Sequence, residues 1–271
     1  MFSFWQEPFL WIGLAVGLIS GLLCALMGFF VILKRMVFIG IAISQIAGLG
    51  VVLGLMAGLN PYISSFILSV TISIFFWLYN TERDIPKDTV VAFIYLVSAG
   101  LTTILIAKNP RVEVHGFNIV SGNLLYVTTG DLVVSLLGGV FVLLFFLYFF
   151  RSLVFISYDR ETALTSGIEG ILSDFLFYLL LGIIVSISIR TSGLLFVFAS
   201  MIIPPMTAFK IFTSVNRIIT GSLFITGISV ISGFCLSYNF DLPTSPLIIC
   251  IYGLFFVVGL ALFLTSHHSG V

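Results

Sequence analysis

Residues Gly21–Gly54 read GLLCALMGFFVILKRMVFIGIAISQIAGLGVVLG, two apolar runs separated by Lys34 and Arg35. A helix needs roughly 20 consecutive apolar residues to cross the hydrocarbon of a bilayer, and it satisfies its backbone hydrogen bonds internally. Each run is long enough once it is followed outward, to Phe9 on one side and to Ala57 on the other. The stretch therefore predicts two membrane-spanning helices joined by a short basic turn.

The whole chain has the composition of a membrane protein. Hydrophobic residues make up 60% of the 271 positions, charged residues make up 8%, and the mean hydropathy is +1.25. A soluble core of this size cannot bury so much apolar surface, so we expect an all-α integral membrane protein, a polytopic bundle in the lipid bilayer. The net charge of zero argues against a nucleic-acid partner.

The apolar runs predict eight to nine transmembrane helices in a single domain that covers residues 1–271. Nine candidates can be delimited, one of which is short enough to be re-entrant: Phe9–Leu33, Met36–Ala57, Tyr62–Tyr79, Thr89–Ala107, Leu132–Phe150, Ser173–Ile189, Gly193–Phe212, Ile218–Ser237 and Pro246–Leu264. Cys24, Cys235 and Cys250 lie inside these runs without CxxC spacing, so we interpret them as small buried hydrophobic residues.

The distribution of Lys and Arg predicts the orientation, because both accumulate in cytoplasmic loops. With the N-terminus outside, the cytoplasmic side holds Lys34, Arg35, Arg83, Lys87, Arg151, Arg160, Lys210 and Arg217, and the outer side holds Lys108, Arg111 and Arg190. The opposite topology inverts this ratio. We therefore expect a multi-pass protein with its N-terminus outside and its C-terminus in the cytoplasm. MFSFWQEPFL contains no Lys or Arg, so the first span is not expected to be a cleaved secretory signal.

An unusually polar segment, SYDRETALTSGIEG at 157–170, separates the fifth and sixth predicted spans on the cytoplasmic side. Asp159 is a suitable N-cap, and Glu161, Ala163 and Gly167 follow at helical spacing. We predict a short docking helix parallel to the membrane. The alternative is an ordinary solvated turn between two spans.

The order and spacing of several motifs resemble the metal-ion ABC importer permeases, which take up zinc, manganese and iron, and within them the zinc-uptake type. Besides the opening stretch and the segment at 157–170, these motifs are LNPY, DTVVAFIYLVSAG, SGNLLYVTTGDL, TSGLLFVFASMIIPPMTAF and FDLPTSP. The resemblance covers nearly the whole chain. It implies the ABC importer permease fold, a homodimer in the bacterial cytoplasmic (inner) membrane, a cytoplasmic ABC ATPase subunit and an extracytoplasmic metal-binding protein.

The same resemblance implies roles for particular residues. The spacing Glu161, Ala163, Gly167 matches the coupling helix through which such permeases contact their ATPase. ATP is then bound and hydrolysed by the partner, since this chain lacks a GxxxxGK[ST] phosphate loop, and we expect neither enzymatic activity nor a bound cofactor. The transported species is expected to be a divalent metal ion.

One feature departs from the family pattern. Family members usually carry an Asp and, four residues later, a His in the second span, where this chain has Ile41 and Gln45. A family His in the fourth span falls on or near Leu96. All eleven carboxylates lie in loops or at span ends, so the sequence offers no confident metal ligands and no charged position at mid-membrane.

Neutral groups are therefore the candidates for a translocation path. Ser44 and Gln45, beside Ile41, are the polar pair at the depth where family members carry the Asp and His. Gln45 is equally suited to forming a hydrogen bond with a neighbouring helix. Pro204 and Pro205 are expected to break the seventh span and free backbone carbonyls, either as part of a gate or as a structural kink.

Glycines recur at four-residue spacing in the first span, at Gly13, Gly17 and Gly21, and frequently in the second. This pattern indicates close helix packing, within the chain rather than across a dimer.

Three functions fit the sequence to different degrees. The favoured one is a metal-importer permease whose selectivity resides in its binding protein. The second is a permease of the same architecture for a non-metal or chelated substrate, or a degenerate subunit paired with another permease. The third, an intramembrane enzyme, requires catalytic His and acidic residues within the spans, which the sequence lacks.

Overall fold

The computed structural model describes residues 8–79, 86–109, 122, 124, 127–158 and 170–268. Within these ranges nine helices are long and apolar enough to cross a membrane, and no strand is present. The predicted all-helical bundle is therefore confirmed. The helices are α1 (Pro8–Leu33), α2 (Val37–Ala57), α3 (Pro61–Leu78), α4 (Lys87–Lys108), α6 (Thr129–Tyr158), α8 (Gly170–Ser192), α9 (Leu194–Ile211), α10 (Val215–Phe240) and α11 (Thr244–His268).

Most predicted boundaries agree with these helices to within a few residues, and α6 differs most. It continues eight residues past Phe150, so Arg151 lies inside the helix rather than in a loop. The apolar residues Leu153–Ile156 after Arg151 sustain the helix, and two of them, Leu153 and Ile156, are buried against other helices. A single arginine near a helix end is tolerated because its long side chain reaches the interface.

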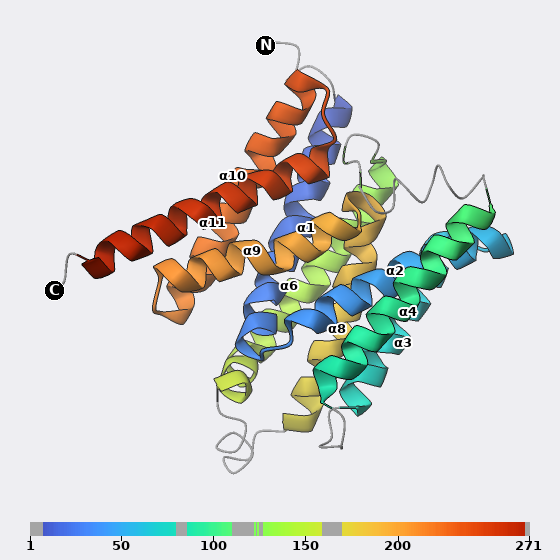
Figure 1. The fold of residues 1–271 in the computed structure, drawn as a ribbon, viewed down its shortest axis with the longest axis horizontal. Helices are drawn as coiled ribbons and strands as arrows, with labels where there is room; N and C mark the ends of the chain where they lie inside the picture. The colour runs from blue at the N-terminus through green and yellow to red at the C-terminus, as the bar shows by residue number, and fades with distance from the viewer. Residues whose placement is uncertain are drawn as a thin grey trace.

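The helices form a central group with a flank on either side (Figure 1). The central group is α1, α6 and α8, which pack on one another. One flank consists of α2, α3 and α4, with α3 packed on α8, and the other consists of α9, α10 and α11, with α9 and α10 packed on α1. Thus α1 and α8 connect the flanks, and α6 contacts mainly these two central helices.

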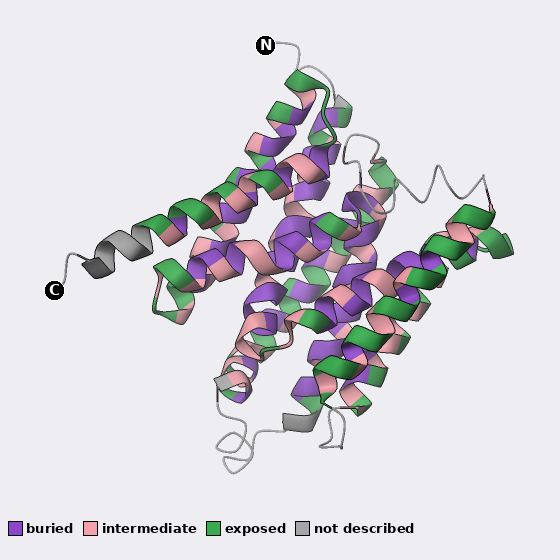
Figure 2. Ribbon diagram, in the orientation of Figure 1, coloured by how far each residue is buried: buried purple, intermediate pink, exposed green. Residues whose placement is uncertain are grey.

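Burial follows this arrangement (Figure 2). In each of α1, α2 and α8, two thirds of the most apolar stretch of 18 residues is buried, whereas the share is 17% in α4 and 22% in α6. The cysteine prediction is confirmed for Cys24, which is buried, but it is wrong for Cys250, which is exposed on α11. An apolar run does not specify which of its residues face the bundle, because a span is apolar on all sides.

The glycine-rich face of α1 packs within the chain, as predicted. A Cβ at Gly21 would lie 3.1 Å from Thr226 Cγ2, one at Gly17 3.4 Å from Val230 Cγ1, and one at Gly13 3.1 Å from Phe234 Cζ. The residue numbers of the α10 partners increase as those of the α1 glycines decrease, so the two helices are antiparallel. Small residues let the backbones approach closely, which favours packing between helices in lipid.

The prediction that Pro204 and Pro205 break the seventh span is wrong. Helix α9 runs without interruption from Leu194 to Ile211, and both prolines are buried inside it. Pro205 has no N–H to offer the carbonyl of Met201. That carbonyl instead faces α1 at Gly28, where an added Cβ would lie only 1.9 Å from its oxygen. Contact with a neighbouring backbone, including Cα–H···O, helps to accommodate such a group inside a membrane helix.

This contact predicts that Gly28→Ala weakens the fold. The new methyl group overlaps the Met201 carbonyl, which is backbone and cannot swing away, so α1 and α9 must separate. We expect a loss of about 1–3 kcal/mol in the free energy of unfolding, measured as a lower melting temperature of the purified protein in detergent. Gly253→Ala on α11 is the matched control, because nothing lies within 4 Å of a Cβ there. Equal melting temperatures for the two variants contradict the close approach.

Candidate functional site

The path candidates on α2 differ in how far they are buried. Ile41 and Gln45 are one turn apart and both half-buried, whereas Ser44 is 1% exposed and points into the bundle. The Ser44 hydroxyl has no hydrogen-bond partner among the residues that the structure describes. Within the described residues the Gln45 amide also makes no side-chain hydrogen bond, so the structure shows no helix-bonding role for it. The Gln45 amide is therefore the more accessible of the two groups, and the Ser44 hydroxyl is enclosed by the bundle.

The α2 surface around these residues is shaped by close contacts with two other helices. A Cβ at Gly40 would lie 2.9 Å from Met201 Sδ of α9, and one at Gly50 would lie 2.7 Å from the Ser65 backbone of α3. Pro204 and Pro205 follow Met201 in α9, so the two prolines belong to the helix that packs beside the first turns of α2. Leu96, at the family's histidine position, is 65% exposed on α4, which packs on α2.

The carboxylates in the described part of the chain are placed as predicted, at helix ends. They are Asp88 and Asp131 in the first turns of α4 and α6, Asp174 near the start of α8, and Asp241 at the C-cap of α10. The other acids lie outside the described residues. No group of three or more His, Cys, Asp or Glu side chains suitable for a metal ion occurs in the described ranges. Their spans therefore contain hydroxyl, amide, thiol and aromatic groups, but no ionised ligand at mid-depth.

One end of α8 is anchored by an ion pair that the sequence analysis did not identify. Lys34, in the turn between α1 and α2, pairs with Asp174, and both side chains are at most 10% exposed. The Lys34 ammonium also lies 5.0 Å from the ring centroid of Phe177, one turn further along α8. The Lys34 side chain thus connects the α1–α2 turn to the beginning of α8.

A second polar contact at this end joins α4 to α8. Lys87, the first residue of α4, contacts the hydroxyl of Tyr178 and lies over its ring. The same hydroxyl donates to Met36 Sδ at 2.8 Å. Tyr178 is 1% exposed, so its hydroxyl bonds within the protein. The start of α8 is therefore fixed to both the α1–α2 turn and the start of α4.

The opposite end of α8 carries another ion pair. Arg190 Nε lies 2.5 Å from Asp131 Oδ1 of α6, and the guanidinium carbon lies 3.9 Å from the Tyr62 ring centroid of α3. Asp131 Oδ2 accepts hydrogen bonds from the Thr128 hydroxyl and backbone N–H, which caps α6. Helix α8 is thus held at one end by an ion pair with the α1–α2 turn and at the other end by an ion pair with α6.

The predicted coupling residues Asp159, Glu161, Ala163 and Gly167 lie outside the described residues. The helices on either side of them are described, since α6 ends at Tyr158 and α8 begins at Gly170. The segment therefore connects directly to the helix that both ion pairs hold. Asp174 lies four residues after the start of α8.

Comparisons with known proteins give a consistent result. The model of the ABC 3 transport family matches residues 6–263. The chain is 29% identical to the high-affinity zinc uptake system membrane protein ZnuB of Haemophilus influenzae, covering 91% of this chain and 95% of that protein. It is 27% identical to the manganese transport system membrane protein MntC of Halalkalibacterium halodurans (95% and 87% covered). It is also 27% identical to a probable iron transport system membrane protein of H. influenzae (96% and 97%).

Two solved structures share the fold. PsaBC from Streptococcus pneumoniae, in complex with Fab, superposes with a TM-score of 0.83 at 24% identity, covering 95% of this chain and 92% of that one. An inward-facing structure of a putative metal-chelate type ABC transporter gives a TM-score of 0.77 at 15% identity, with 92% and 84% covered. The arrangement of helices described above is therefore that of known ABC transporter membrane subunits.

The buried pair Lys34–Asp174 predicts an asymmetric response to substitution. Lys34→Met removes the ammonium that pairs with the buried Asp174 carboxylate, which we expect to cost about 1.5–3 kcal/mol in the free energy of unfolding, the range for a hydrogen bond to a charged group. The double variant Lys34→Met/Asp174→Leu removes both charges and should recover part of that loss. Thermal unfolding in detergent measures both effects. Asp88→Asn, at an exposed site on α4, is the control and should change little. A double variant as unstable as Lys34→Met contradicts the pairing.

Proposed function

The chain belongs to the ABC 3 transport family, and on this basis we propose that it is the permease subunit of an ABC importer for divalent metal ions. The observation that carries the proposal is the similarity along almost the whole chain to permeases named for zinc, manganese and iron transport. The shared fold supports it. Zinc is the proposed cargo, in keeping with the similarity to ZnuB, and manganese and iron(II) are the alternatives.

The proposed assembly contains two copies of this chain, two cytoplasmic ATPase subunits and an extracytoplasmic binding protein. Eight of the eleven Lys and Arg residues fall on one side of the membrane in the predicted topology, which supports an outer N-terminus and a cytoplasmic C-terminus. The proposed location is the bacterial inner membrane. The chain itself acts as a conduit rather than an enzyme, and ATP hydrolysis belongs to the partner.

In this proposal the conduit coordinates its cargo weakly. An ion must bind well enough to enter but loosely enough to leave, and a mid-membrane carboxylate slows departure of a dication. Here the candidate ligands are neutral, namely the Gln45 amide and the Ser44 hydroxyl, which has no hydrogen-bond partner in the described part of the chain. Selectivity for the metal then resides in the binding protein, with the permease supplying a path and a gate.

A second candidate function follows from the same residues. Ile41 and Gln45 replace the Asp and His that family members usually carry, and Leu96 occupies the position of another family His. A path without ionised ligands also suits a chelated metal or a non-metal solute. It equally suits a degenerate subunit that pairs with a permease retaining the ligands.

The test is transport by the complex reconstituted in liposomes with its ATPase and binding protein. We expect ATP-dependent uptake of zinc, manganese or iron(II), and flat traces for all three ions exclude the metal importer.

If Gln45 is only a weak ligand, Gln45→Ala should reduce uptake by no more than a few-fold, since one membrane hydrogen bond contributes on the order of 1 kcal/mol. Abolished uptake by a correctly assembled variant makes Gln45 an essential ligand or gate.

The proposed coupling segment gives a separate prediction. Gly167→Trp adds a bulky side chain where docking requires a small residue, and Glu161→Lys reverses a charge expected to face a basic or donor-bearing ATPase surface. Both variants should retain less tagged ATPase on co-purification and should lose substrate-stimulated ATP hydrolysis together with uptake. Insertion should be unaffected, because neither residue lies in a span predicted from the sequence. Unchanged ATPase retention and uptake in both variants identify the segment as an ordinary loop.

A further inference from the structure

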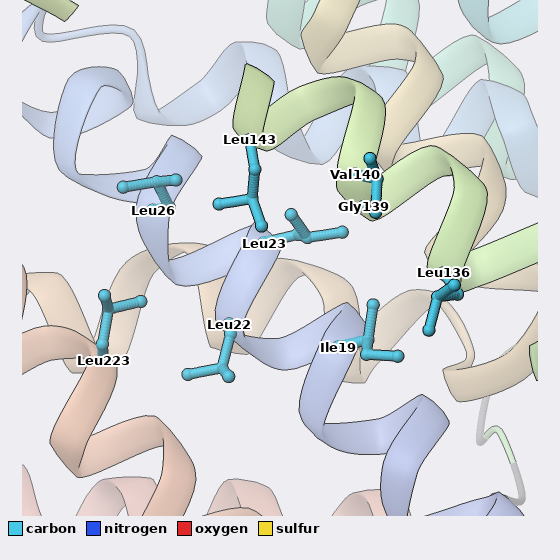
Figure 3. Close-up of a pocket in the computed structure, with 9 residues that line it drawn as sticks. All are labelled: Ile19, Leu22, Leu23, Leu26, Leu136, Gly139, Val140, Leu143 and Leu223. Atoms are coloured by element: carbon cyan, nitrogen blue, oxygen red, sulfur yellow. The ribbon is translucent and has the colours of Figure 1, made fainter. Parts of the chain in front are cut away.

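An apolar groove of about 290 Å³ lies where α1, α6 and α10 meet (Figure 3). Its lining consists of nine aliphatic or glycine residues and exposes no polar surface: Ile19, Leu22, Leu23, Leu26, Leu136, Gly139, Val140, Leu143 and Leu223. In Figure 3 the side chains of α1 and α6 line the groove along its length, and Leu223 of α10 lies at one end. Only an apolar ligand suits these walls, because a polar group there would lose its hydrogen bonds to water.

The groove opens away from the rest of the bundle. On α6 the lining residues Leu136, Val140 and Leu143 are each about half exposed (50%, 48% and 50%), and Leu147 beyond them is 80% exposed. Helix α6 packs mainly on α1 and α8, whereas the path candidates lie on α2 and α9. Therefore α1 and α8 lie between α6 and α2, and the groove faces the surroundings of the bundle.

The groove lies at hydrocarbon depth. A Cβ at Gly139 would lie 3.3 Å from Ile19 Cγ2 and 3.5 Å from Leu23 Cδ1, so this part of α6 is level with the middle of α1. Leu143 and Leu223 stand at the end of the groove nearer to the α1–α2 turn. In Figure 1, α6 runs in the same direction as α1, and α10 runs in the opposite direction. The C-terminal end of α6 and the N-terminal end of α10 therefore lie at one end of the bundle.

Two exposed cations lie beyond this end of the groove. Arg151 is eight residues past Leu143 on α6, about 12 Å at 1.5 Å per residue, and Arg217 is six residues before Leu223 on α10, about 9 Å. Neither arginine makes an ion pair with a residue in the described part of the chain. Half of the hydrocarbon layer is about 15 Å thick, so a chain starting at these cations reaches well into the groove.

We propose that this groove binds an anionic phospholipid, with one acyl chain between α1, α6 and α10 and the phosphate near Arg151 and Arg217. The arginines distinguish a lipid from a second copy of this chain. A lipid phosphate brings a negative charge to the two cations, whereas a second copy packed symmetrically on the same surface adds cations of its own. The lipid fills a space that otherwise leaves leucine side chains without packing partners. This site is separate from the candidate translocation path.

The test measures phospholipid retained by the dimer after detergent exchange, using native mass spectrometry. Val140→Trp and Leu223→Trp fill the groove from two different helices, and Ile67→Trp, at a position that is 54% exposed on α3 and does not line the groove, is the matched control. We expect the wild-type protein and Ile67→Trp to retain phosphatidylglycerol and both groove-filling variants to lose it. Two fillers are used so that a folding defect in one variant, seen as a lower melting temperature, does not decide the result.

The headgroup is tested by adding phosphatidylglycerol or phosphatidylcholine to delipidated protein. Arg151→Gln/Arg217→Gln should lower the preference for the anionic lipid by about fivefold for each arginine. Lys108→Gln, at the end of α4 remote from the groove, should leave the preference unchanged. Equal lipid retention by all Trp variants, or a preference insensitive to both arginines, overturns the proposal. Dissociation of the dimer by both fillers also overturns it, because the groove is then an interface between two copies.

Discussion

The exclusion of charge from the hydrocarbon layer determines how this bundle is held together. The charged side chains in the described part of the chain lie in turns or within about two turns of a helix end, because burying an ion at mid-membrane is costly. The helix ends are therefore the places where electrostatic contacts form, and α8 has one at each end. Between them the helices are held by close packing of small residues and by neutral hydrogen bonds.

Neutral contacts are numerous in the centre of the bundle. The Ser200 and Tyr252 hydroxyls, from α9 and α11, lie 3.2 Å apart, and Cys24 of α1 donates to Ser188 of α8 at 3.7 Å. Such bonds are individually modest in a membrane, contributing about 0.6 kcal/mol on average. They align helices without fixing them as strongly as a buried ion pair does. Helices with anchored ends and weakly bonded centres can shift relative to one another, as a transporter that changes shape requires.

Helix α8 follows residues 159–169, the proposed ATPase contact, directly in the chain. It packs on α1, on α2 and α3 of one flank, and on α9 of the other flank. Lys34 and Tyr178 connect the start of α8 to the α1–α2 turn and to α4. We therefore expect a displacement of α8 to reach α2, which carries three of the path candidates, both directly and through that turn.

The spans, their approximate ends and the family could be predicted from the sequence, because hydropathy and span length are local properties of the chain. The position of the described acids at helix ends could be predicted too, since each acid follows or precedes an apolar run. The tertiary structure was needed to show that Lys34 pairs with Asp174, 140 residues away, and that α9 continues through Pro204 and Pro205 beside Gly28. It likewise decided which face of each span is buried, and hence the groove between α1, α6 and α10. These features depend on which helices become neighbours, and uniformly apolar spans carry little periodic signal to specify that.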